Sequence, residues 1–153
     1  MMFEKSVRFT GFPWATLPRD SEDKLDAAAQ TCKALAVSMV TRANSGHPAG
    51  ALSSMKMYMA AYAASNITPE NCGSLDRDYV VVSHGHTSAA AYATLAYFGF
   101  VDALDAVNEF RSTGSRFQGH VERMVSGIDW GSGCLGQGLS AWAGFALAPR
   151  ARG

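Results

Sequence analysis

One stretch of the chain, residues 79–82 with the sequence YVVV, has the β-branched composition of a buried strand in a parallel sheet. Apolar residues at three- and four-residue steps, or runs rich in alanine, predict helices at residues 21–43, 52–64, 87–98, 102–110 and 139–147. Pro149 is expected to break the last helix. This order of elements predicts a helix-rich α/β domain whose parallel sheet is incomplete in this chain.

The chain divides into a short arm and one domain. Residues 1–20 contain Gly11, Pro13 and Pro18 without a helical or strand period, so we expect an N-terminal extension there. Residues 21–153 are enough for one compact domain. Within it, residues 111–135 form a long glycine-punctuated segment of a kind that usually has a function.

The overall charge excludes some functions. With 13 basic and 13 acidic residues, the chain has no net field to attract nucleic acid or an anionic membrane. Only 17% of residues are charged, which favours an apolar interface with another subunit. The three cysteines lack CxxC spacing, and no apolar run reaches the roughly 18 residues of a membrane span. We therefore expect a cytoplasmic oligomer without disulfides.

All four histidines lie in short glycine turns. They are His47 in SGHP, His84 and His86 in SHGH, and His120 in QGH. Glycine lets the backbone approach a ligand, and an imidazole can exchange a proton there near neutral pH. A single such histidine is more often structural, but four of them favour one shared site. The HxH spacing of His84 and His86 is only a weak zinc signal, because no cysteine or carboxylate follows at ligand spacing.

A second glycine cluster, residues 131–138 with the sequence GSGCLGQG, precedes the last helix. A glycine-rich loop that leads into a helix N-terminus presents backbone N–H groups to an anion such as a diphosphate. Glycine loops also serve as flexible connections, so this cluster alone does not separate an anion site from a simple linker.

Four ordered motifs resemble the N-terminal, diphosphate-binding domain of transketolases, over residues 21–147. They are NSGHP at 44–48, DRD at 76–78 with Ser83 and GH at 85–86, FR, GS and GH between 110 and 120, and Gly133 with LGQG at 135–138. The resemblance implies the front portion of a thiamine-diphosphate-binding three-layer fold. It also implies a transferase of the pentose phosphate pathway, which moves a two-carbon ketol unit between sugar phosphates by means of thiamine diphosphate.

The same resemblance assigns roles by position. His86 is similar to the family histidine that contacts the cofactor diphosphate, and Gly133 and Leu135 to contacts in the same pocket. His120 is similar to the histidine near the aminopyrimidine and the reacting donor. His47 is similar to the one that contacts substrate hydroxyls and aids proton transfer.

The chain also departs from the family. His84 stands where many relatives have lysine, Val121 where they often have proline, and Cys134 where proline or serine is usual. Relatives continue into a Gly-Asp-Gly turn and an asparagine that hold magnesium, but no Gly-Asp-Gly occurs in these 153 residues. The resemblance therefore implies a partial diphosphate-binding domain at residues 21–153, without metal ligands of its own. We expect it to need a second copy or a complementary C-terminal subunit for activity.

Two other functions remain open at this point. A non-catalytic paralogue or partner subunit would explain the missing metal ligands equally well, although the retained histidines favour an enzyme. Another thiamine-diphosphate activity, such as dihydroxyacetone synthesis, is also compatible with the motifs.

Overall fold

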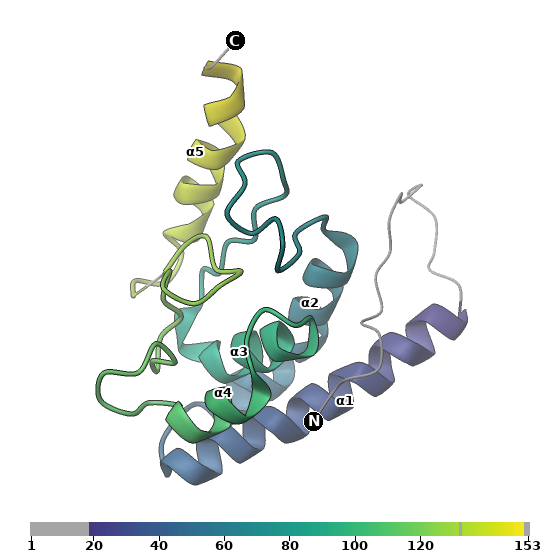
Figure 1. Cartoon of the computed structure of the whole chain (residues 1–153), viewed down its shortest axis with the longest axis vertical. Coiled ribbons are helices and arrows are strands. Elements are labelled where there is room, and N and C mark those ends of the chain that lie inside the picture. Colours follow the sequence, from purple (N-terminus) through teal and green to yellow (C-terminus); the bar gives the residue numbers. More distant parts are fainter. Residues whose placement is uncertain (1–18, 132, 152–153) are drawn as a thin grey trace.

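The computed structural model describes residues 19–131 and 133–151, and helices dominate this part of the chain (Figure 1). The helices are α1 (Arg19–Ala43), α2 (Pro48–Ala64), the 3-10 helix η1 (Gly85–Thr87), α3 (Ser88–Tyr97), α4 (Ala103–Glu109) and α5 (Gly138–Ala151). None of these helices is both long and apolar enough to cross a membrane. The predicted extension at residues 1–20 lies outside the described residues except for its last two, which begin α1.

The core lies where α1, α2 and α3 pack against one another, with α4 against α1 and α3. The apolar side of α1 is buried through Cys32, Ala36 and Met39, which recur at the predicted three- and four-residue steps. Helix α3 is buried along nearly its whole length, because its alanines let the neighbouring helices approach it closely. The sequence SAAAYATLAY thus makes a central helix rather than a surface one.

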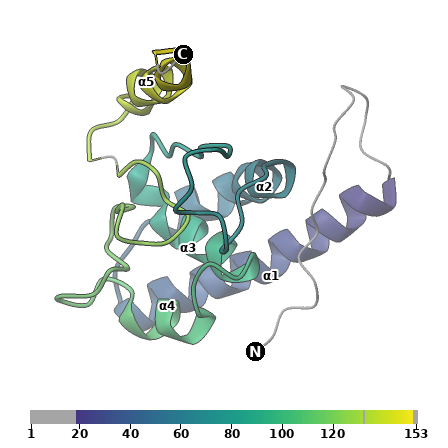
Figure 2. The ribbon, with the colours of Figure 1, turned by 45° about the horizontal axis from the view of Figure 1, so that its top comes forward.

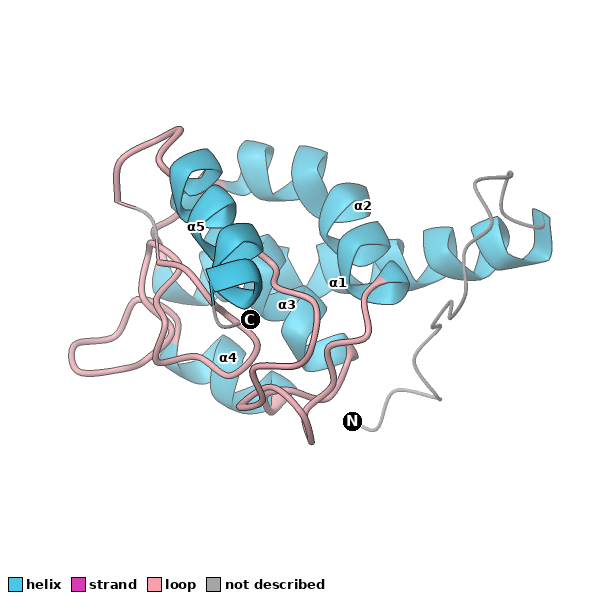
Figure 3. Ribbon diagram, turned by 90° about the horizontal axis from the view of Figure 1, so that it is seen from above, coloured by secondary structure: helices cyan, strands magenta, loops and turns pink. Residues whose placement is uncertain are grey.

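The predicted strand at residues 79–82 does not form. Val81 makes a single parallel bridge with Trp130, and no strand occurs in the part of the chain that the structure describes (Figure 3). The backbone N–H of Val80 donates to the side chain of Asp129 instead of to a neighbouring strand. A β-branched segment needs partner strands to become a sheet, and only one residue pair is available to it here. The helix-rich prediction holds, whereas the α/β layering does not appear among these residues.

Three helix boundaries differ from the sequence predictions by two residues or more. Helix α1 begins at Arg19 and α2 at Pro48, four residues before the expected start at residue 52. Proline suits the first helical position because the N–H that it lacks would have no intrahelical partner there. The expected stop at Pro149 is wrong, since α5 continues through it to Ala151. At this position the missing N–H affects only the last turn of the helix.

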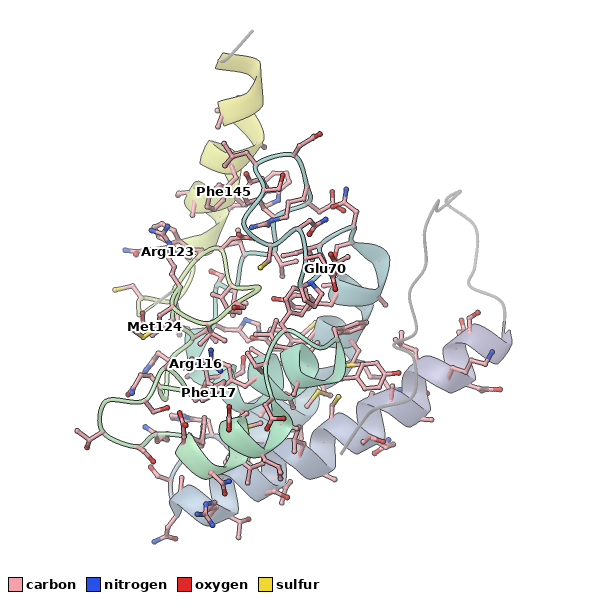
Figure 4. All side chains as sticks on the ribbon, viewed as in Figure 1. Glu70, Arg116, Phe117, Arg123, Met124 and Phe145 are labelled. Carbon is pink, nitrogen blue, oxygen red and sulfur yellow. The ribbon has the colours of Figure 1, made fainter. Side chains whose placement is uncertain are left out.

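Helix α5 stands away from the other helices (Figure 2). Phe145 connects it to the loop before the histidine turn, stacking on Tyr79 with ring centroids 4.8 Å apart (Figure 4). Its apolar side chains Leu139, Trp142 and Leu147 are 74%, 53% and 58% exposed. This helix therefore carries an apolar surface that nothing in the described part of the chain covers.

A buried ion pair fastens the loop of residues 72–80 to the segment before the glycine cluster. The Arg77 guanidinium donates to both carboxylate oxygens of Asp129, at 2.9 and 2.6 Å, and the two side chains are only 5% and 8% exposed. It also donates to the carbonyls of Cys72 and Asp78. The hydrogen bonds to Asp129 raise the pKa of Arg77, so its guanidinium stays charged.

Candidate functional site

Three helix N-termini meet at residues 83–86. Helix η1 begins within this turn at Gly85 and runs directly into α3. Helix α2 begins just after His47, whose ring lies 5.4 Å from the ring of His86. At the start of α5, the backbone N–H of Gly138 donates to Ser83 Oγ at 3.1 Å. Because each helix N-terminus carries partial positive charge and free N–H groups, their meeting point favours an anion.

The imidazoles of His84, His86 and His47 stand in a row at this point. The rings of His84 and His86 have centroids 6.2 Å apart, those of His86 and His47 5.4 Å apart, and both contacts are edge-on. His47 is the N-cap residue of α2, but its side chain makes no capping hydrogen bond. The three residues, called the imidazole row below, therefore offer proton-exchanging groups beside the helix N-termini.

His84 is held by the side chains of α2 and η1. Its Nε2 lies 3.3 Å from Ser54 Oγ, and its ring stacks on Tyr58 at 5.5 Å. The Thr87 hydroxyl donates to the carbonyl of His84 at 2.9 Å, and it has only one hydrogen to give. The Tyr58 hydroxyl, 2.8 Å from Thr87 Oγ1, must then be the donor in that contact. These bonds fix both the backbone and the ring plane of His84.

The surroundings of His84 disfavour its protonation. Burial lowers the pKa of His84, and the neighbouring His86 lowers it further. Burial raises the pKa of Tyr58 to about 12, so this phenol stays neutral beside the imidazole. His84 therefore acquires a proton less readily than an ordinary histidine.

Glycine lets α2 approach the row closely. A Cβ atom at Gly50, in the first turn of α2, would lie 3.1 Å from Thr87 Cγ2 and 3.7 Å from His86 Nε2. The His86 ring thus lies against the backbone of α2, which limits its orientations.

His120 reaches the turn through its backbone neighbours. The N–H of Val121 donates to the carbonyl of Gly85 at 3.0 Å, and the Ser88 hydroxyl donates to the carbonyl of Gly119 at 2.9 Å. The side chain of His120 is exposed, and no ring contact to the imidazole row is seen among the described residues. The structure thus brings the backbone of residues 119–121 to the turn at residues 83–86, whereas the His120 ring is exposed.

Phe117 anchors this segment to the core. Its ring is fully buried against Tyr92, with ring centroids 5.3 Å apart. The Arg116 guanidinium lies over the Phe117 ring, with its Cζ 4.9 Å from the ring centroid (Figure 4). The Phe117 carbonyl accepts the backbone N–H of Arg111 at 2.8 Å. A buried aromatic side chain three residues before His120 therefore sets where this histidine lies.

The glycine cluster meets the turn at Ser83 and is otherwise open. The N–H of Gly136 donates to the Ser83 carbonyl at 3.4 Å, in addition to the bond from Gly138. Leu135 is 68% exposed, and a Cβ at Gly133 would meet no atom within 4 Å. These two predicted pocket residues are close in sequence to Gly136, which bonds to Ser83, but no contact between them and the imidazole row is seen among the described residues.

Replacing Gly138 by alanine is expected to loosen the attachment of α5. The added Cβ would lie 2.7 Å from Ser83 Cβ and 3.0 Å from its Cα, a clash of a kind that costs about 1–3 kcal/mol. Amide hydrogen exchange at Gly136 should become faster. Gly144→Ala in the same helix is the matched control, because its Cβ meets nothing within 4 Å. Equal exchange at Gly136 in both variants would contradict this attachment.

Sequence reasoning did not find the residues that hold the site together. Ser54, Tyr58 and Thr87 fix His84, and Asp129 pairs with Arg77. The four-residue spacing of Ser54 and Tyr58 places them on one face of α2, which is a signal that could have been used. Nothing in the sequence spacing indicates the pairing of residues 77 and 129. Within the described ranges, no group of three or more His, Cys, Asp or Glu side chains is arranged to hold a metal ion.

Comparison with known proteins agrees with the motifs. A family model described as "Transketolase, thiamine diphosphate binding domain" matches residues 24–152. Transketolase 1 of Saccharomyces cerevisiae is 36% identical over 126 residues, which is 82% of this chain and 18% of that protein. The transketolase of Treponema pallidum is 36% identical over 130 residues, 84% of this chain and 20% of its own. The chain thus spans about a fifth of the length of these relatives.

Solved structures give the same result. The transketolase of Pichia stipitis in complex with sedoheptulose 7-phosphate superposes with a TM-score of 0.74 at 35% identity, covering 81% of this chain and 18% of that one. The transketolase of Leishmania mexicana has a TM-score of 0.72 at 32% identity, covering 81% and 19%. By sequence and by structure, this chain belongs to the transketolase family and corresponds to its thiamine diphosphate binding domain.

Proposed function

We propose that residues 83–86 bind the diphosphate of thiamine diphosphate. The observation that carries this proposal is the meeting of three helix N-termini at a turn lined by imidazoles. A diphosphate suits this place because backbone N–H groups and protonatable rings both stabilise negative oxygens. The close approaches of Gly50 to Thr87 and of Gly138 to Ser83 hold the starts of α2 and α5 against this turn.

His86 is the residue we assign to the diphosphate, since its ring lies between those of His84 and His47. Gly133 and Leu135 are assigned to the wall of the same pocket, which their exposed positions leave open to a ligand. Thiamine diphosphate, when bound, supplies the carbon nucleophile for cleaving the bond beside a ketose carbonyl. The chain's part is to hold the cofactor and to move protons near it.

His47 and His120 are assigned to proton transfer with the substrate. Both side chains are exposed beside the turn, where a ligand could reach them. An imidazole suits this role because its ordinary pKa lies near working pH. The reaction proposed for the whole protein is transfer of a two-carbon ketol unit between sugar phosphates. It is supported by the transketolase relatives, one of which was solved with sedoheptulose 7-phosphate.

The residues present do not fit a magnesium ion. No suitable cluster of ligands lies within residues 19–131 and 133–151, and the sequence contains no Gly-Asp-Gly turn. A hard cation of this kind prefers several oxygen ligands, including carboxylates. We therefore assign no step to magnesium.

The uncovered side of α5 supports the proposal that this domain, residues 21–153, works against another polypeptide surface. Leu139, Trp142 and Leu147 are large apolar side chains exposed on a helix that packs on none of the other described helices. Patches of this kind are typical of protein interfaces. A second copy of the chain and a complementary C-terminal subunit are the two partners that we propose.

Calorimetry tests the proposed function. Thiamine diphosphate and inorganic diphosphate are expected to compete for one weak site whose affinity does not depend on magnesium. Thiamine, which lacks the diphosphate, is expected not to bind. If thiamine binds as tightly as thiamine diphosphate, the diphosphate assignment is wrong. If thiamine diphosphate binds tightly and only with magnesium, the conclusion that these residues do not fit the metal is wrong.

A further inference from the structure

The imidazole row contains one ring that the assigned roles leave unused, namely His84. It is also the most firmly held of the three, through Ser54, the Tyr58 ring and the Thr87 hydroxyl. His86 lies between it and His47, within 6.2 Å of both ring centroids. At such distances a charge on one ring disfavours a charge on the next.

The titratable groups that face His84 come from the two elements packed against it. Helix α2 contributes Tyr58, which stays neutral because burial raises its pKa to about 12. Helix η1 contributes His86, whose charge lowers the pKa of His84 in addition to the effect of burial. Neither element places a carboxylate against the His84 ring that would offset these two effects.

We propose that His84 and His86 form a coupled pair that takes up a proton when the diphosphate binds, with both rings then donating to the anion. This inference rests on the proposed function, because it takes the diphosphate as the anion. The proton comes from solvent and adds to a ring nitrogen, and no other bond is made or broken. An anion with several negative oxygens offsets the repulsion between the two rings, so that both can then be protonated.

The geometry gives each nitrogen of His84 a place. A protonated His84 donates through Nε2 to Ser54 Oγ, 3.3 Å away. Its Nδ1–H is then left for an anion oxygen. The stack on Tyr58 and the Thr87 bond hold the ring in this orientation before the anion arrives, so little is lost in ordering it.

The coupling is tested first without any ligand. Imidazole resonances of the full chain are followed by NMR from pH 5 to 8, in the wild-type protein and in His86→Gln. His84 is expected to titrate below the ordinary histidine range, and its pKa is expected to rise in His86→Gln. An unchanged His84 titration in that variant would overturn the coupling, whatever the chain binds.

The uptake of a proton is tested with inorganic diphosphate. Its affinity is measured at pH 6 and pH 8 for the wild type and for His84→Gln, which keeps a hydrogen-bonding group near Ser54 but cannot become charged. The wild type is expected to gain about tenfold more affinity on acidification than the variant, as one additional charge-assisted hydrogen bond would give. The protonation of free diphosphate cancels in this ratio, because it is the same for both proteins.

Serine variants give a second measurement that keeps His84 in place. Ser54→Ala is expected to reduce the gain in affinity at pH 6. Ser53→Ala is expected to leave it unchanged, because the Ser53 hydroxyl is exposed and bonds to the carbonyl of Gly50. Equal pH dependence in the wild type, His84→Gln and Ser54→Ala would overturn the inference alone. A wild-type chain that binds no diphosphate at either pH would overturn the proposed function together with it.

Discussion

Replacing Arg77 by alanine is expected to lower the free energy of unfolding by about 3–5 kcal/mol, the usual cost of breaking a buried ion pair by removing one partner. The substitution leaves the Asp129 carboxylate buried at 8% exposure without its cation, and it removes donors from the carbonyls of Cys72 and Asp78. The loss is to be measured by urea denaturation followed by circular dichroism.

Two further variants separate the ion pair from a general effect of removing arginine. Arg42→Ala, at an exposed position in the last turn of α1, is expected to change the unfolding free energy by less than about 1 kcal/mol. Arg77→Met combined with Asp129→Leu is expected to cost less than Arg77→Ala, because no charge is left buried alone. Equal losses in Arg77→Ala and Arg42→Ala would contradict the ion pair's role.

The helices could be predicted from the sequence because their signals are local. The apolar spacing of α1 and the alanine content of α3 give elements within a few residues of those found. The strand prediction at residues 79–82 failed because a strand forms only where other strands pair with it, and the local sequence does not show whether they do. Residues 79–82 have strand composition, yet Val81 finds a single partner in Trp130.

The site was predictable to a similar extent. The glycine turns mark out His47 and His86, and the structure places their rings in contact. The side chains that hold the neighbouring His84, by contrast, come from positions 54 and 58 on α2. The four-residue spacing of Ser54 and Tyr58 places them on one face of α2, but only the packing of α2 against η1 shows that this face meets His84. The same holds for Asp129, which is far from Arg77 in the chain.

His86→Ala is expected to weaken binding of thiamine diphosphate about 10- to 150-fold, the range that corresponds to a lost hydrogen bond with a charged partner of about 1.5–3 kcal/mol. His47→Ala is expected to leave the affinity within about threefold of the wild type, because its ring contacts His86 only edge-on at 5.4 Å. Both dissociation constants are to be measured by competition with inorganic diphosphate. An equal loss of affinity in the two variants would refute this division of roles.

The complementary result is expected in turnover. In the assembled enzyme, at saturating cofactor, His47→Ala should lower kcat for ketol transfer by about 10²- to 10⁴-fold, as the loss of a positioned proton-transfer group does. His86→Ala at the same saturation should recover most of its activity, because its defect lies in holding the cofactor. The position of His47 suits this role. It is the N-cap residue of α2, its side chain makes no capping hydrogen bond, and its ring is exposed where a substrate hydroxyl could reach it. The two histidine rings are in contact, so a double variant whose loss in kcat/KM is smaller than the product of the single losses would show that they act through one bound ligand.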